Sequence, residues 1–165
     1  MPNILVFARI RTTYVEQIAE GELRAVCKLN DTLNEATVEI GVKTPELEII
    51  KARAQVVRTP SGVKLNEMEL MSRVVGIRIG PGMKKIIRGL IGQADESKQL
   101  AFMIEECCNA VILSFTKDVL VQTPEDKRGE KDFYRNMVKE NIRLYNRCAA
   151  FAPGSSLVEG IEPPY

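Results

Sequence analysis

The sequence contains no histidine, and this absence excludes more chemistry than any other feature of its composition. Imidazole is the side chain that changes charge near neutral pH and the most frequent metal ligand. Ser-His-Asp, Cys-His and histidine-zinc mechanisms are therefore all excluded together. Any general base in this protein must come from another residue type, such as a carboxylate.

Long apolar runs are also missing, since none approaches the ~20 residues of a membrane span. The first residues, MPNILVFARIR, have no basic residue before their short apolar stretch, so they do not match a signal peptide. A net charge of +1 excludes a general polyanion-binding surface, so any binding of an anion must depend on a local patch of positive charge. We expect a cytoplasmic protein without membrane contact. Nucleic acid is not an expected partner, because only Phe7 could stack on bases from the outward strand positions.

The chain has few cysteines, and their spacing fits neither a metal site nor a disulfide framework. Free thiols in a reducing compartment are the expected state. A chain of 165 residues can bury roughly two-thirds of its unfolded surface, so it needs no disulfide or metal for stability. No metal or haem site is indicated, and the sequence leaves any cofactor unspecified. The cysteines are Cys27, Cys107, Cys108 and Cys148.

Apolar and polar residues alternate with a period of two through the first third of the chain, which predicts half-buried strands. The pattern covers residues 4–11, 22–30 and 35–42, with a turn-forming NDTLN segment between the last two. Residues 46–59 are ambiguous, because Thr44-Pro45-Glu46 is also a helix start signal. We favour a strand there, since it completes a sheet of four.

From Lys64 onward the apolar period becomes 3.6, which predicts helices. The segments are residues 64–76, a short helix from Met83, a long helix from Glu96 to about Val119, and a last helix after Thr123 that Gly129 could break. The long helix has a wide apolar stripe and is expected to cover the sheet. We therefore predict an α+β fold: a four-stranded, mostly antiparallel sheet with one face covered by C-terminal helices.

Residues 1–152 are predicted to form a single domain, and residues 153–165 an extended C-terminal arm. The arm sequence is punctuated by proline and glycine, with apolar islands at Leu157, Val158 and Ile161. Such an arm is suited to contact a second copy of the chain. A homodimer is therefore among the expected assemblies.

The segment GIRIGPGMKKIIRG, residues 76–89, is the first candidate site, because no acid occurs between Glu69 and Asp95. A turn at Gly80 and Gly82 ahead of a helix leaves backbone N–H groups free at the positive end of the helix dipole. Lys84, Lys85 and Arg88 add full charges. This predicts a site for phosphate, carboxylate, or the pyrophosphate of a nucleotide or coenzyme A. A tight turn followed by a solvated helix face is the favoured interpretation of this segment, and the anion site is the functional alternative.

The segment EECCNA is the second candidate, since Glu105 and Glu106 lie beside a thiol in one helical turn. A carboxylate base acting without histidine is conceivable there. However, both cysteines fall on the apolar stripe, where a buried thiol is inert. Burial in the core is the favoured interpretation.

The cations of the strands form a third candidate, because they could line an anionic groove. Acids share the same faces, so cross-strand pairing on a solvated surface is the favoured interpretation. The cations are Arg9, Arg11, Arg24, Lys28, Lys51 and Arg53, and the acids are Glu22, Glu35 and Glu39.

The stretch VVGIRIGPGMKKIIRGLIG resembles an uncharacterised bacterial family, a domain of unknown function. That family has an antiparallel half ending near a proline and an L/V-x-G-x-x-I-x-x-G signature, which here falls on Val74, Val75, Gly76, Ile79 and Gly82. The resemblance covers about residues 20–120. The order of strands and then helices is also loosely similar to iron-sulfur-cluster scaffold proteins. Members of the uncharacterised family commonly have a cysteine shortly after the proline and a Gly-Cys-Thr-His-Leu-like element that opens the last helix. This chain has SGV, residues 61–63, at the first place and ESKQLAF, residues 96–102, at the second, with no cysteine or histidine in either. A cluster is therefore not expected by that route.

Three functions follow from these patterns. The first is an accessory or binding protein that recognises a small anionic ligand, a cofactor precursor or a partner protein at the Gly80-to-Arg88 helix start. The second is a small cofactor-free enzyme, a lyase, isomerase or transferase, with Glu105 or Glu106 as base and a phosphorylated or coenzyme A-linked substrate. The third is a structural subunit of a larger complex.

Overall fold

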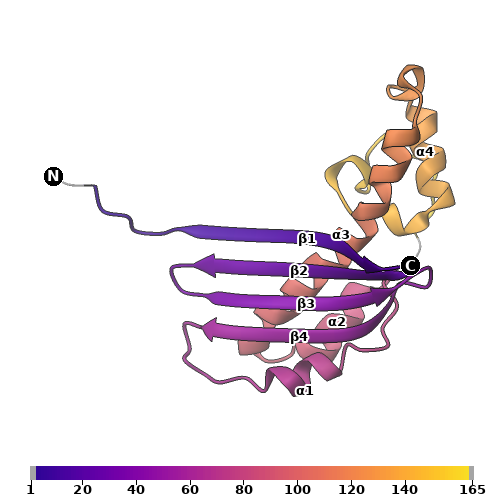
Figure 1. Ribbon diagram of the computed structural model, residues 1–165. Helices are drawn as coiled ribbons and strands as arrows, with labels where there is room; N and C mark the ends of the chain where they lie inside the picture. Colours follow the sequence, from indigo (N-terminus) through magenta and orange to yellow (C-terminus); the bar gives the residue numbers. More distant parts are fainter. Residues whose placement is uncertain (1–2, 164–165) are drawn as a thin grey trace.

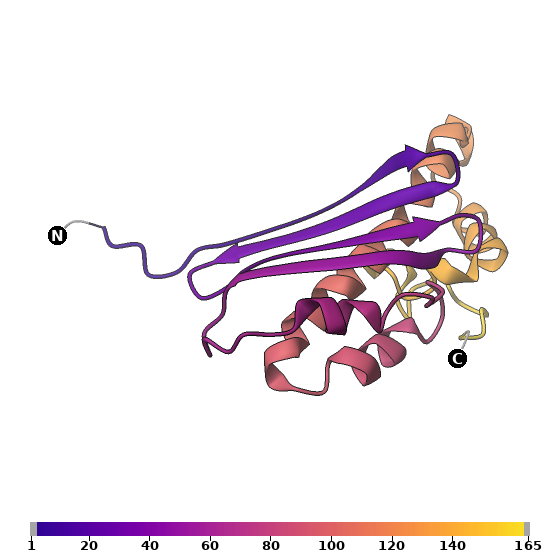
Figure 2. The same cartoon turned by 60° about the horizontal axis from the view of Figure 1, so that its bottom comes forward.

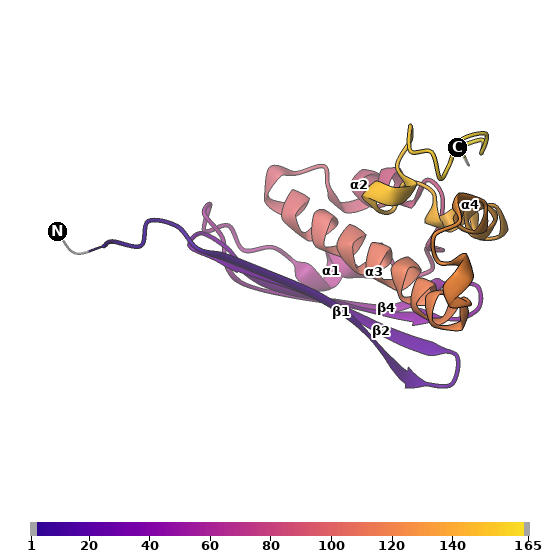
Figure 3. The ribbon, with the colours of Figure 1, turned by 90° about the horizontal axis from the view of Figure 1, so that it is seen from above.

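The computed structural model describes residues 3–163, apart from the side chains of Asp118, Leu120 and Gln122. Four antiparallel strands form one sheet in the order β1-β2-β3-β4, and helices cover one of its faces (Figure 1). This confirms the predicted α+β fold. Figure 3 shows the opposite face of the sheet without helices. The strands are β1 (Arg9–Ala19), β2 (Glu22–Asp31), β3 (Glu35–Lys43) and β4 (Glu48–Arg58).

The ambiguous segment, residues 46–59, forms β4, so the choice of a strand was correct. It pairs with β3 in antiparallel register, with Val38 opposite Ala54 and Ile40 opposite Ala52. Ile49 is buried, and Ala52, Ala54 and Val56 pack against the core on the helix-covered face. Pairing with a neighbouring strand therefore decided between two locally compatible structures.

The helical half contains α1 (Glu67–Ser72), α2 (Met83–Ile91), α3 (Lys98–Gln122) and α4 (Lys131–Glu140), with single 3₁₀ turns between and after them. The 25-residue α3 runs across the sheet, as Figures 1 and 3 show. Its predicted apolar stripe is buried against β2 and β3, and a fully buried aliphatic side chain stabilises the fold by about 1.5–3 kcal/mol. The buried stripe residues are Leu100, Met103, Ile104, Cys107, Cys108, Val111 and Ile112.

The first strand begins later than the sequence predicts. Residues 4–8 lie outside it, and β1 instead runs from Arg9 to Ala19. The last backbone contact to β2 is made at Ala8, whose carbonyl accepts a hydrogen bond from the N–H of Thr32 at 3.1 Å. Before Ala8 no strand lies alongside residues 3–7 in the described chain, so the alternating pattern there has no partner.

Two helices also differ from the prediction. The predicted helix over residues 64–76 shortens to the six residues of α1, after which Gly76 turns the chain at φ 89°. The 3.6-residue period over residues 64–76 predicts that Met68 faces the core, but Met68 is 83% exposed, while Met71 and Val74 are buried. The helix predicted after Thr123 is interrupted at Gly129, and α4 starts at Lys131.

The C-terminal residues lie against the helices. Residues 152–161 form successive turns, with the N–H groups of Ser155, Val158 and Ile161 each bonded three residues back. Val158 is buried in the core at 4% exposure. Residues 153–161 therefore form turns packed on the core where an extended arm is predicted, and residues 164–165 lie outside the described chain.

Candidate functional site

The candidate anion site is built on the first turn of α2. Gly82 precedes this helix at φ 76° and ψ −11°, a left-handed conformation that glycine adopts without strain, and no side chain caps the helix there. Met83, Ile87 and Ile91 are buried, and they anchor one face of α2 in the core. This orientation leaves Lys85 exposed and Lys84 half-buried at the start of the helix.

The two lysines are not neutralised by the chain itself. Neither Lys84 nor Lys85 forms an ion pair with any carboxylate that the structure describes. Two positive charges therefore lie beside the positive end of the α2 dipole with no compensating acid.

Arg88 behaves differently from the lysines. Its Nε and Nη2 donate to the two oxygens of Glu105 at 2.6 and 2.9 Å, which is a bidentate pair between α2 and α3. The Glu105 carboxylate, by accepting these bonds, raises the pKa of Arg88. The Glu105 side chain is only 4% exposed. Arg88 therefore holds α2 on α3, and its charge is already engaged.

Two further arginines approach the turn from the far end of the chain. Arg147 donates from Nη2 to the Gly80 carbonyl at 3.1 Å and from Nη1 to the Asn109 side chain at 3.2 Å. The Nε of Arg143 lies 3.8 Å from the position that a Cβ on Gly80 would occupy. Gly80 itself is buried. Sequence reasoning missed both arginines, because no local pattern connects them with a turn more than sixty residues earlier.

The two candidate glutamates of α3 point to different elements. Glu105 binds Arg88 of α2, whereas Glu106 forms an ion pair with Arg11 of β1 at 3.6 Å. The Arg11 guanidinium also lies 4.9 Å from the centre of the Phe102 ring. Each carboxylate is thus paired with an arginine. The structure does not bring them together at one surface with the lysines of α2.

Three of the cysteines are buried, and their thiols are unreactive. Burial raises the pKa of the Cys27 and Cys107 thiols and raises that of Cys108 to about 12. The Cys107 thiol donates to the Val38 carbonyl at 3.9 Å. At neutral pH these thiols are protonated and therefore poor nucleophiles. Cys148 is the half-buried exception.

Half of the candidate strand cations form ion pairs with carboxylates that the structure describes: Arg9, Arg11 and Arg24 do, whereas Lys28, Lys51 and Arg53 do not. Arg9 binds Asp31 at 2.9 Å, and Arg24 binds both Glu16 and Glu39. Arg11 lies on the helix-covered face beside α3 and not on the open face that the alternation from residue 4 predicts.

Among the side chains that the structure describes, no group of three or more cysteine, aspartate or glutamate residues is placed to hold a metal ion. Within the described part of the chain, none of the helices combines the length and apolar character that a membrane crossing requires. Comparisons of the chain with protein-family models, curated proteins and solved structures found no match. The resemblance to the bacterial family therefore stays a prediction.

Proposed function

We propose that this chain is an accessory or binding protein that recognises an anionic group at the start of α2, over residues 80–88. The ligand is a small anion, a cofactor precursor or an acidic surface of a partner protein. The observation that supports this most is the pair of uncompensated lysines, Lys84 and Lys85, beside a helix start that no side chain caps.

The geometry favours a group presented from outside over a ligand enclosed by the protein. Pro81 and Lys85 are exposed, so an anion would meet the helix start on an open surface. Contributions from a helix dipole at such a surface are about 0.3–1 kcal/mol and decrease with salt. The dipole alone therefore changes affinity by no more than about fivefold, and a lone phosphate is expected to bind weakly, with a Kd of about 1 mM or higher. Tighter binding requires a ligand or partner that makes additional contacts.

Isothermal titration tests this proposal with inorganic phosphate, ATP, coenzyme A and a poly-glutamate peptide as probes. Lys84→Ala/Lys85→Ala should weaken binding of the responsive probes about tenfold or more, because it removes both free charges. Lys127→Ala/Lys131→Ala is the matched control, since it removes two exposed lysines at another surface. The Kd of this control variant for each probe should stay within about twofold of the wild-type value. Absence of binding to every probe, or equal losses in the two double variants, would contradict the proposal.

The enzyme alternative receives less support. It needs Glu105 or Glu106 as a general base, and each of these carboxylates is paired with an arginine. Glu105 would have to leave Arg88 before it could accept a proton from a substrate.

A further inference from the structure

The N-terminal arm, defined here as residues 3–7, presents a run of large apolar side chains to solvent. Ile4, Leu5 and Val6 are 81%, 82% and 87% exposed, and Phe7 is 52% exposed. Figures 1 and 2 show the arm continuing the line of β1 away from the rest of the molecule. A contiguous apolar segment of this kind is typical of an interaction site.

The arm has the sequence of a strand but no neighbour to pair with. Ile4, Leu5, Val6 and Phe7 are all apolar, Ile, Val and Phe are residue types enriched in strands, and the run leads directly into β1. At its base the Ala8 N–H donates to Thr32 Oγ1, and the Ala8 carbonyl accepts from the Thr32 N–H, both at 3.1 Å. Conflict between a strong local pattern and an unpaired conformation points to a missing partner.

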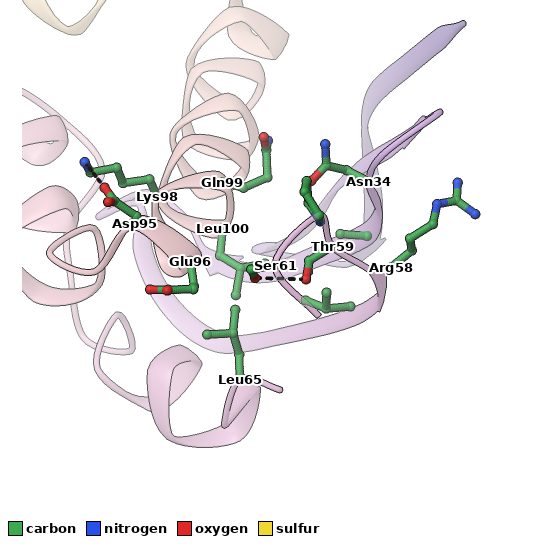
Figure 4. Close-up of a pocket in the computed structure, with 13 residues that line it drawn as sticks. Asn34, Arg58, Thr59, Ser61, Leu65, Asp95, Glu96, Lys98, Gln99 and Leu100 are labelled. Atoms are coloured by element: carbon green, nitrogen blue, oxygen red, sulfur yellow. Dashed lines mark hydrogen bonds and ion pairs between the residues drawn. The ribbon is translucent and has the colours of Figure 1, made fainter. Parts of the chain in front are cut away.

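A hollow of about 340 Å³ opens at the same end of the sheet (Figure 4). It lies between the end of β4, the following loop and the start of α3, and Asn34 lines it two residues after Thr32. Its volume is in the range of small ligand pockets. The apolar residues that line it are Ala36, Val56, Pro60, Leu65 and Leu100.

The hollow of the same chain is not a suitable place for the arm. Arg9 is held by its ion pair with Asp31, and Ala8 is held by Thr32, so the chain leaves the sheet in an extended direction pointing away from the body. Folding back would require a reversal at these fixed residues. A second copy would need no such reversal, because two copies related by a two-fold axis at this end would each extend an arm toward the other.

We propose that two copies of this chain exchange their N-terminal arms, with each arm laying its apolar side chains into the hollow of the other copy. Five extended residues reach about 17 Å, which suits a segment crossing from one copy to the next. Burying one such side chain removes about 100 Å² of apolar surface from water. Two arms with four such side chains each bury about 800 Å². The two hollows add less, because Ala36 and Leu100 in their lining are already buried within one copy. The total is on the order of 1,000 Å², which is the lower limit of a specific interface. This assembly is independent of the anion site.

Sedimentation equilibrium of the full chain tests the exchange. The wild type should be a dimer at micromolar concentration, and Leu5→Asp should be a monomer with an unchanged circular dichroism spectrum, because Leu5 makes few contacts within one copy. Met68→Asp is the matched control, since Met68 is 83% exposed and lies on α1 away from the arm. It should remain dimeric. A monomeric wild type at 100 μM, or a dimer that survives Leu5→Asp, would overturn the proposal.

A disulfide experiment identifies which chain the arm contacts. Leu5→Cys and Ser61→Cys are combined in a Cys148→Ser background, because Ser61 lines the hollow and Cys148 is the half-buried native thiol. Mild oxidation should produce a covalent dimer on a non-reducing gel. A disulfide within a single chain would show that the arm folds back, and the proposal would then be wrong. Failure of the pair to crosslink at all, in a protein that is dimeric, would equally count against it.

Discussion

Replacing Arg88 with alanine isolates the contact that fastens α2 to α3. The substitution removes two hydrogen bonds, of 2.6 and 2.9 Å, from the carboxylate of Glu105, whose side chain is 4% exposed. Breaking a buried pair by removing one partner costs about 3–5 kcal/mol. Because the Arg88 side chain is 65% exposed, water reaches this edge of the pair and lowers the cost. We expect a loss of about 2–3 kcal/mol in the free energy of unfolding.

Urea unfolding followed by circular dichroism measures this loss. With an m-value of about 2 kcal/mol/M, the midpoint should fall by roughly 1–1.5 M. Arg73→Ala is the control: its partner Glu69 is 56% exposed, so the free energy of unfolding should change by no more than about 1 kcal/mol. Arg88→Ala/Glu105→Leu should recover much of the loss, since it leaves no buried charge without a partner. Equal effects of Arg88→Ala and Arg73→Ala would refute this reasoning.

Three other predictions concern the turns, the thiols and the β2–β3 hairpin. Gly82→Ala should destabilise the fold by about 1 kcal/mol, because the φ of 76° at this position is unfavourable for alanine. Gly89→Ala should stabilise the fold by about 0.5–1 kcal/mol, because Gly89 lies inside α2 with open space around it. Thermal unfolding of the two variants measures both effects. An alkylating reagent should modify only Cys148 in the native protein and all four cysteines after denaturation, as mass spectrometry of tryptic peptides will report. Burial raises the pKa of Asp31, but hydrogen bonds from the Asn34 and Leu33 N–H groups and from Arg9 lower it by more than burial raises it. The net effect is a pKa of about 2, below the ordinary value of 3.8. The stabilisation that ionised Asp31 provides is thus fully present above pH 3.8 and is lost as the pH falls toward 2. The difference in free energy of unfolding between wild type and Asp31→Asn should therefore become smaller over that pH range, as acid titrations of both proteins will measure.

The sequence predicted the elements whose signal is local. Alternation at Val38, Ile40 and Val42 identified a strand with one buried face, and the structure buries all three. The stripe of α3 is long enough for its 3.6 period to be unambiguous. Both patterns depend on neighbours within a few residues of the same chain segment, so composition and spacing were sufficient.

The features that the sequence did not predict depend on contacts between distant segments, and residue spacing within one segment carries no information about such contacts. Residues 4–8 have the pattern of a strand, but β2 ends too early to pair with them. Arg88 belonged to the predicted anion site on charge alone, yet a carboxylate 17 residues away, Glu105, binds it. Arg143 reaches Gly80 only because the chain after α4 folds back over the start of α2. Each difference follows from tertiary packing.

The central claim is that the start of α2 binds an anion, and a ¹⁵N–¹H correlation spectrum recorded during a titration with inorganic phosphate tests it most directly. We predict saturable shifts of the Gly82, Lys84 and Lys85 amides that weaken as salt is added, with little change at Lys127. Unchanged α2 amides, or equal small shifts at every exposed lysine, would contradict the claim.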